Sequence, residues 1–168
     1  MVRALARMVA PFLLILSAIA AYPAATALPA GSWRLVEAKG YEGVIVPAAD
    51  APDFFWMVNG QQYEEYWTPT AANIADLEAA IVPAFAALPP SLVSGEQLDT
   101  YRRQYGGFVE DGRRLIRISF FCDAIFPHVE QYWQCRTIFA AGGGACFFRL
   151  TYDPASGAFF DLSVNGPI

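Results

Sequence analysis

Lysine is almost missing from this chain of 168 residues, in which Lys39 is the one lysine beside ten arginines. Acidic residues number 16 against 11 basic residues, and the formal net charge is -5 at pH 7. A protein that binds nucleic acid or an anionic membrane surface needs an excess of positive charge. This balance therefore argues against both classes as the main partner.

A hydrophobic run long enough to span a bilayer is also missing. The apolar run from Met8 to Ala21 has about 14 residues, whereas a membrane-spanning helix needs about 20. Arg3 and Arg7 precede this run, and Ala25-Thr26-Ala27 follows it as a cleavage pattern, with residues 18–20 as a second possible site. The sequence predicts a signal peptide over residues 1–27, membrane contact only during export, and a secreted or periplasmic product.

Residues 28–168 are enough for one domain with its own core, and no internal repeat divides them. Prolines and glycines in residues 28–52 predict an irregular lead-in that contains a short edge strand over residues 43–46. The aromatic residues 54–58 predict a second strand. Asn59-Gly60 then predicts a hairpin turn that returns through residues 61–66.

One helix is predicted after Thr68-Pro69-Thr70, which supplies an N-cap hydroxyl and a proline suited to a first turn. Pro83 predicts a kink or a restart, because proline lacks the N–H that the helix needs. Pro89-Pro90 predicts the end of the helix. Apolar residues at spacings of three and four form one face: Ile74, Leu77, Ile81, Phe85 and Leu88.

The second half of the chain predicts an antiparallel meander. Strands over residues 101–109 and 114–122 flank Asp111-Gly112, a strong hairpin signal. Strands over residues 145–152 and 158–164 flank a second turn at residues 153–157. The predicted fold class is α+β: an antiparallel meander of four or more strands with one main amphipathic helix packed on one face.

Five short segments follow one another in this part of the chain: Tyr66 to Thr70, Tyr101 to Tyr105, Gly142 to Phe148, Tyr152-Asp153 and Asn165-Gly166. In this order they resemble a family of uncharacterised small exported bacterial proteins, over about residues 60–168. The resemblance implies an exported bacterial domain, and it implies no activity or site. The helix-then-meander order is similar to that of cystatin-like folds, which concerns the fold alone.

Three cysteines lie within a short stretch: Cys122, Cys135 and Cys146. In an exported protein they predict one disulfide and one leftover thiol. If the strands around Ser119 and Arg149 pair with each other, Cys122 and Cys146 lie opposite one another. This pairing favours the disulfide Cys122–Cys146 over Cys122–Cys135. His128 would complete a Cys3His set for zinc, but the paired C-x2-C spacing of zinc knuckles is absent, so we predict neither a metal nor another cofactor.

Catalytic residues do not form a known pattern in this sequence. His128 could act with Asp123 or with a cysteine in a small hydrolase-type enzyme, which stays an alternative. The triple glycine at residues 142–144 lacks the lysine and the helix that follow it in a phosphate-binding loop. The sequence therefore favours a non-enzymatic protein.

The second face of the meander is predicted to be polar and cationic. The two-residue turn at Asp111-Gly112 places Gln104 opposite Ser119, and the pairing that brings Cys122 opposite Cys146 places Arg149 beside Ser119. This polar row crosses three strands, lies next to Arg117 and is bordered by phenylalanines. Guanidinium groups bind carboxylates through paired hydrogen bonds, so this face predicts a site for a small acidic ligand. The predicted ligand-binding residues are Arg102, Gln104, Arg117, Ser119 and Arg149.

The function that follows is an exported binding or inhibitor-type module for an unknown protein or a small acidic ligand. Its two candidate contact surfaces are the arginine face and the apolar loop over residues 123–144, which either packs down or presents a patch. The alternatives are the hydrolase-type enzyme with His128 and a structural, envelope-associated protein.

Overall fold

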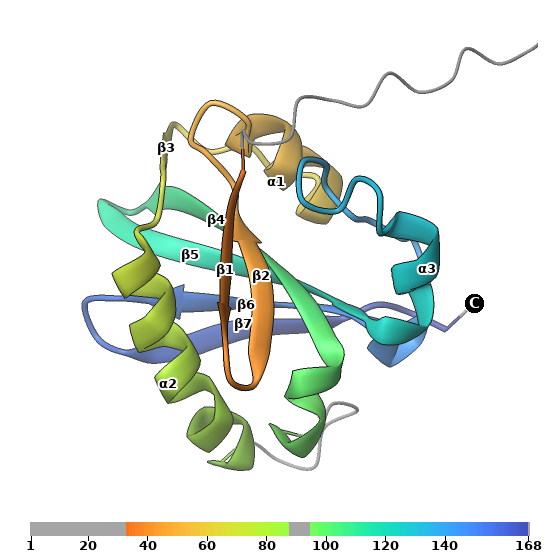
Figure 1. The fold of residues 1–168 in the computed structure, drawn as a ribbon. Helices are drawn as coiled ribbons and strands as arrows, with labels where there is room; N and C mark the ends of the chain where they lie inside the picture. The colour runs from red at the N-terminus through yellow and green to blue at the C-terminus, as the bar shows by residue number, and fades with distance from the viewer. Residues whose placement is uncertain (1–32, 88–94, 168) are drawn as a thin grey trace, which may run out of the picture.

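The computed structural model describes residues 33–87 and 95–167, so the predicted signal peptide lies outside the described residues. Seven strands form one open sheet in the order β1-β2-β4-β5-β6-β7, with β3 paired to β4 (Figure 1). All neighbours are antiparallel except β2 and β4, which run parallel. The predicted α+β class and its antiparallel meander are confirmed.

The strands are β1 (Arg34–Ala38), β2 (Tyr41–Ile45), β3 (Glu65–Trp67), β4 (Tyr101–Glu110), β5 (Arg113–Cys122), β6 (Phe147–Asp153) and β7 (Ala158–Val164). The α-helices are α1 (Ala51–Asn59), α2 (Ala71–Ala87) and α3 (Phe126–Val129). Short 3-10 turns are η1 (Gly95–Thr100), η2 (Asp123–Ile125) and η3 (Gly144–Cys146). None of the helices in the described ranges is long and apolar enough to cross a membrane.

The predicted turn between β4 and β5 is present. Asp111 and Gly112 both have positive φ, 50° and 73°, and Glu110 pairs with Arg113 across them. This is the geometry of a type I′ hairpin, which suits the twist of the two strands. Turn chemistry thus sets the register of the central pair of strands.

The predicted irregular lead-in is wrong within the described residues. A β1–β2 hairpin begins at Arg34, and β2 lies between β1 and β4, so residues 43–46 are not an edge strand. Val44 and Ile45 are both buried, one on each face of the sheet. Double-sided burial explains why this short segment lacks the polar alternation of an edge.

The predicted strand over residues 54–58 is also wrong, because this segment is helix α1. Phe54, Phe55 and Val58 are buried while Trp56 and Met57 are exposed, which is a helical period. Gly60 follows as the left-handed C-cap, with φ 67°, and does not form a hairpin turn. Pro52 near the N-terminus of α1 was the available sequence signal for a helix.

Helix α2 begins as predicted, with the Asn73 N–H donating to Thr70 Oγ1 at 3.2 Å. The helix continues through Pro83 to Ala87 without the predicted restart, and Leu88 with the Pro89-Pro90 stop lies outside the described residues.

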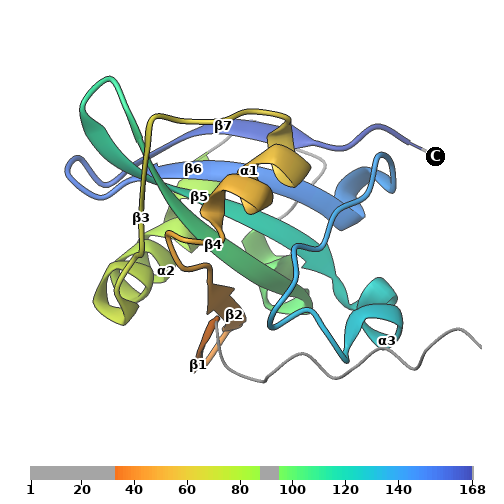
Figure 2. The ribbon, with the colours of Figure 1, turned by 90° about the horizontal axis from the view of Figure 1, so that it is seen from above.

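The sheet is covered on both faces, by α1 and α3 on one side and α2 on the other (Figure 1). The α2 layer packs Ile74, Leu77 and Ile81 against a buried cluster that includes Ile118 and Leu150. On the opposite face, seen from above in Figure 2, α1 packs against the residues of β4 and β5. The expectation of a helix on one face only is therefore incomplete.

Two adjacent glycines of β4 let these layers approach closely. A Cβ atom at Gly106 would lie 2.6 Å from the Phe54 ring of α1. A Cβ atom at Gly107 would likewise come too close to Trp67 of β3, on the other face of the sheet. This close approach explains why a side chain is absent at both positions.

A buried ion pair links α2 to β4. Arg103 Nε lies 3.1 Å from Glu78 Oε1, although this N–H is not directed as a hydrogen bond. Tyr105 donates its hydroxyl to the same oxygen at 2.8 Å, and the Arg103 guanidinium donates to the carbonyls of Leu98 and Tyr101. Burial raises the pKa of the Glu78 carboxyl, and the Arg103 charge opposes that rise.

We expect Glu78→Ala to lower the free energy of unfolding by about 3–5 kcal/mol, because it leaves the buried Arg103 charge without a counter-ion. The double variant Glu78→Leu/Arg103→Met removes both charges and should recover most of the loss. Urea denaturation of the three proteins measures both effects. A double variant no more stable than Glu78→Ala would contradict the assignment.

Candidate functional site

The strand register on the face opposite α2 agrees with the predicted polar row. Gln104 of β4 lies opposite Ser119 of β5, and Ser119 lies opposite Arg149 of β6. Arg117 is flanked in the same way by Gly106 and Thr151. The structure therefore brings together four of the five predicted site residues, with Arg102 two residues before Gln104 on the same face.

This face is covered, however, and the expectation of an exposed cationic platform is wrong. The exposed fractions of Gln104, Arg117 and Ser119 are 0%, 6% and 8%. Helix α1 and the segment over residues 126–141 lie over them, with Trp133 and Ile138 buried against the sheet. Of the two outcomes predicted for the apolar loop, packing down is the one found over most of its length.

Gln104 holds this covering segment to the centre of the sheet. Its amide nitrogen donates to the carbonyls of Trp133 at 2.8 Å and Arg136 at 2.7 Å. Its amide oxygen accepts the Ile138 N–H at 2.9 Å. Because both donors are used and the side chain is fully buried, Gln104 supports the fold and is not directed toward a ligand.

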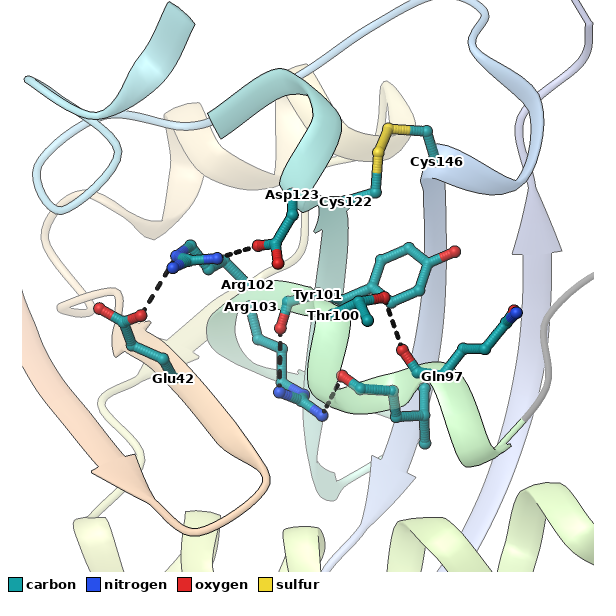
Figure 3. Close-up of polar contacts among 10 residues, drawn as sticks. Glu42, Gln97, Thr100, Tyr101, Arg102, Arg103, Cys122, Asp123 and Cys146 are labelled. Carbon is teal, nitrogen blue, oxygen red and sulfur yellow. Dashed lines mark hydrogen bonds and ion pairs between the residues drawn. A yellow bond between two sulfur atoms is a disulfide. The ribbon is translucent and has the colours of Figure 1, made fainter. Parts of the chain in front are cut away.

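Arg102 has a similar structural role at the start of the covering segment (Figure 3). Its Nε lies 3.1 Å from Glu42 of β2, and its Nη1 binds Asp123 of η2. The guanidinium carbon also lies 3.8 Å from the centre of the Phe126 ring. Arg102 thus joins β2, β4 and the segment that follows β5.

A disulfide closes the base of the same segment. Cys122 at the end of β5 is bonded to Cys146, the last residue of η3 just before β6, as the register predicted (Figure 3). Cys135 is free. The bond closes a loop over residues 123–145. It lowers the conformational entropy of the unfolded chain, which stabilises the fold.

Arg117 lies deep on this face with weak partners. Its Nη2 is 3.9 Å from Asp161 of β7, and its Nε has no hydrogen-bond partner in the described part of the chain. Asp161 has a φ of 54° at a bulge between β6 and β7. The extra residue of the bulge changes which side chains of β7 face Arg117. Thr151 Oγ1, on the neighbouring strand, also has no partner.

Arg149 is half-buried and reaches the surface beside α1. Its Nη1 donates to the Val58 carbonyl at 2.8 Å, near the C-terminal end of the helix. Burial lowers the pKa of the Arg149 guanidinium, and the positive charge of Arg117 lowers it further. Arg149 has no acidic partner within 4.0 Å among residues 33–87 and 95–167.

A surface groove of about 450 Å³ lies beside Arg149, and we call it the Arg149 groove. Its walls come from α1, from the loop at residues 139–141 and from the end of β7. A cavity of about 20 Å³ lies behind the groove and shares Val58, Arg149 and Asn165 with it. This cavity also contacts Ser119, so the polar row leads from the centre of the sheet to the groove.

Exposed apolar side chains gather beside the groove. We define the apolar patch as Trp56, Met57, Tyr132 and Phe139, whose exposed fractions are 61%, 43%, 39% and 52%. Trp56, Met57 and Phe139 line the Arg149 groove, while Met57 and Tyr132 line a second groove of about 550 Å³. The strand predicted over residues 54–58 gave no sign of the α1 part of this patch, because only a helix turns Trp56 and Met57 away from the buried Phe54 and Phe55.

The residues of the hydrolase-type alternative are not hydrogen-bonded to one another in the described part of the chain. His128 is exposed on α3, and it makes no side-chain hydrogen bond to Asp123 or Cys135 within the described ranges. Asp123 binds Arg102, and the Cys135 thiol is hydrogen-bonded to the Tyr132 carbonyl. No group of three His, Cys, Asp or Glu side chains in residues 33–87 and 95–167 is arranged to hold a metal ion.

We expect Gln104→Ala to lower the free energy of unfolding by about 2 kcal/mol or more, because three backbone groups lose their buried partner. Amide exchange should accelerate at residues 133–138. Gln134→Ala, at an exposed position of the same segment, is the matched control and should change neither quantity. Unchanged exchange in Gln104→Ala would contradict the role given to this side chain.

The comparisons with known proteins complete the description of the site. No protein-family model, curated protein or solved structure matches this chain. The resemblance to small exported bacterial proteins stays a prediction.

Proposed function

We propose that this protein is an exported, non-enzymatic binding module that docks a partner protein on the apolar patch. One observation carries this proposal. Six large hydrophobic side chains are exposed in the described residues, and four of them form the patch. Apolar side chains gathered on one face, with polar groups around them, are typical of a surface that binds another protein.

The composition of the patch supports protein binding. Tryptophan, tyrosine, methionine and arginine are enriched in protein interfaces, and tryptophan and tyrosine dominate their binding energy. The patch contains Trp56, Met57 and Tyr132, and Arg136 and Arg149 lie in the two grooves on either side of Met57. The grooves offer concave contacts to side chains of a partner.

The patch is also held on a rigid base. Phe54, Phe55 and Val58 anchor the buried side of α1, and Trp133 and Ile138 anchor the segment that carries Tyr132 and Phe139. An ordered surface loses little conformational entropy when a partner binds. The patch is therefore suited to binding a partner without first having to become ordered.

Two features support export. The sequence predicts a signal peptide over residues 1–27, and the Cys122–Cys146 disulfide is of the kind that persists in oxidising compartments. We include secretion or periplasmic delivery in the proposal on these grounds.

Docking is tested by placing a photo-crosslinking residue at Trp56, Phe139 or Val82 in cells that produce the protein. Val82 is the matched control because it is 52% exposed but lies on α2, on the other side of the sheet. We expect one crosslinked partner from Trp56 and Phe139 and none from Val82. With that partner, Trp56→Ala should weaken binding about 30-fold or more, and Val82→Ala should leave it unchanged. Equal crosslinking from all three positions would contradict docking at the patch.

Export is tested by the intact mass of the protein recovered from the exported fraction. We expect a chain that begins at or near Leu28 and whose peptide map contains the Cys122–Cys146 bond. A full-length chain in the membrane fraction, or three alkylatable thiols in native protein, would contradict this part of the proposal.

A further inference from the structure

We propose that the Arg149 groove binds a carboxylate of the partner protein, with the neighbouring apolar side chain of the partner on Trp56 and Phe139. This inference rests on the proposed function and names the chemistry of the contact. Four observations carry it: the unpaired charge of Arg149, the second arginine behind it, the shape of the groove and its apolar walls.

Arg149 differs from the other buried or half-buried arginines of the described chain. Arg102 pairs with Glu42 and Asp123, Arg103 pairs with Glu78, and Arg117 lies near Asp161. Arg149 has only the Val58 carbonyl as a partner within residues 33–87 and 95–167. A half-buried cation needs a counter-ion, since burial removes part of its hydration.

Arg117 adds a second positive charge close to Arg149. The two guanidinium groups are close enough for Arg117 to lower the pKa of Arg149. Among residues 33–87 and 95–167, Asp161 is the one carboxylate within 4.0 Å of either guanidinium; it lies 3.9 Å from Arg117 and is exposed. Two positive charges therefore have one exposed carboxylate close to them, and an added carboxylate would be attracted by both.

The remaining hydrogen-bond donors of Arg149 suit a carboxylate. Nη1 donates to Val58, so the edge formed by Nε and Nη2 has no partner among the described residues. This edge presents two parallel N–H groups, which match the two oxygens of a carboxylate. Arg149 lines both the groove and the small adjoining cavity, so a ligand in the groove lies against this residue.

The walls of the groove favour a carboxylate attached to an apolar group over a hydrated inorganic anion. Trp56, Met57, Phe139 and Val164 line the groove together with Arg149. A volume of about 450 Å³ accommodates a side chain or a chain end of the partner. Apolar contact on the walls and a charge pair at Arg149 then act on neighbouring groups of the partner.

The test is an NMR titration of the unaltered protein with N-acetylphenylalanine, which carries a carboxylate, and with N-acetylphenylalaninamide, which does not. We expect the carboxylate probe to shift the Arg149 Nε–H and the Trp56 indole resonances, and the amide to bind at least tenfold more weakly. Arg149→Gln should weaken the carboxylate probe about ten- to a hundredfold, and Arg149→Lys should weaken it less, because lysine keeps the charge without the paired donors. Arg34→Gln, an exposed position on β1, is the control.

The inference would be overturned if the two probes bind equally well, or if the Arg149 Nε–H resonance does not shift on addition of the carboxylate probe. It would also be overturned if inorganic phosphate shifts the same resonances as strongly. The comparison of the two probes on the unaltered protein tests the inference even if the variants are destabilised. A partner crosslinked from Trp56, together with no selective carboxylate binding, would overturn this inference and leave the proposed docking intact. Selective carboxylate binding without any crosslinked partner would overturn the proposed docking, and with it the assignment of the carboxylate to a partner protein, while the preference of the groove for a carboxylate would stand.

Discussion

Two consecutive residues of β4 hold the layers on the two sides of the sheet. Successive side chains of a strand point to opposite faces, so Arg103 is directed to α2 and Gln104 to the segment that follows β5. Both side chains are buried, and each needs partners supplied by its own covering layer. The two layers are thereby placed relative to one strand, and α1 packs on the same strand at Gly106.

The arginines of the second half of the chain have distinct tasks that their sequence pattern does not separate. Arg103 is a buried ionic link, and Arg102 joins three elements at the surface. Arg117 lies beneath the covering layer, and Arg149 reaches the groove with most of its donors unused. The same residue type is structural where a carboxylate or several carbonyls surround it, and it is a candidate for binding where they do not.

The covering layer also connects the fold to the proposed function. Its inner side contributes Phe54, Phe55 and Trp133 to the core, and its outer side carries Trp56 and Phe139. A helix turns about 100° per residue, so Phe54 and Phe55 face the core while Trp56 and Met57 face outward, and the short apolar run of α1 supplies both core and patch. The disulfide and Gln104 hold the remaining part of the layer, and the patch is consequently supported at several separate points.

The sequence by itself determined the features that depend on local chemistry. Asp111-Gly112 specified a hairpin, the alternation of β5 specified which residues share a face, and the resulting register brought Cys122 and Cys146 together. Only the tertiary structure decided that residues 54–58 form a helix and that the polar face is covered. A short apolar run fits a buried strand and a buried helix equally well, and the choice depends on packing against distant residues such as Gly106 and Phe108. Whether an arginine on a strand meets a carboxylate, a carbonyl or solvent likewise depends on which layer lies above it, and no local pattern contains that information.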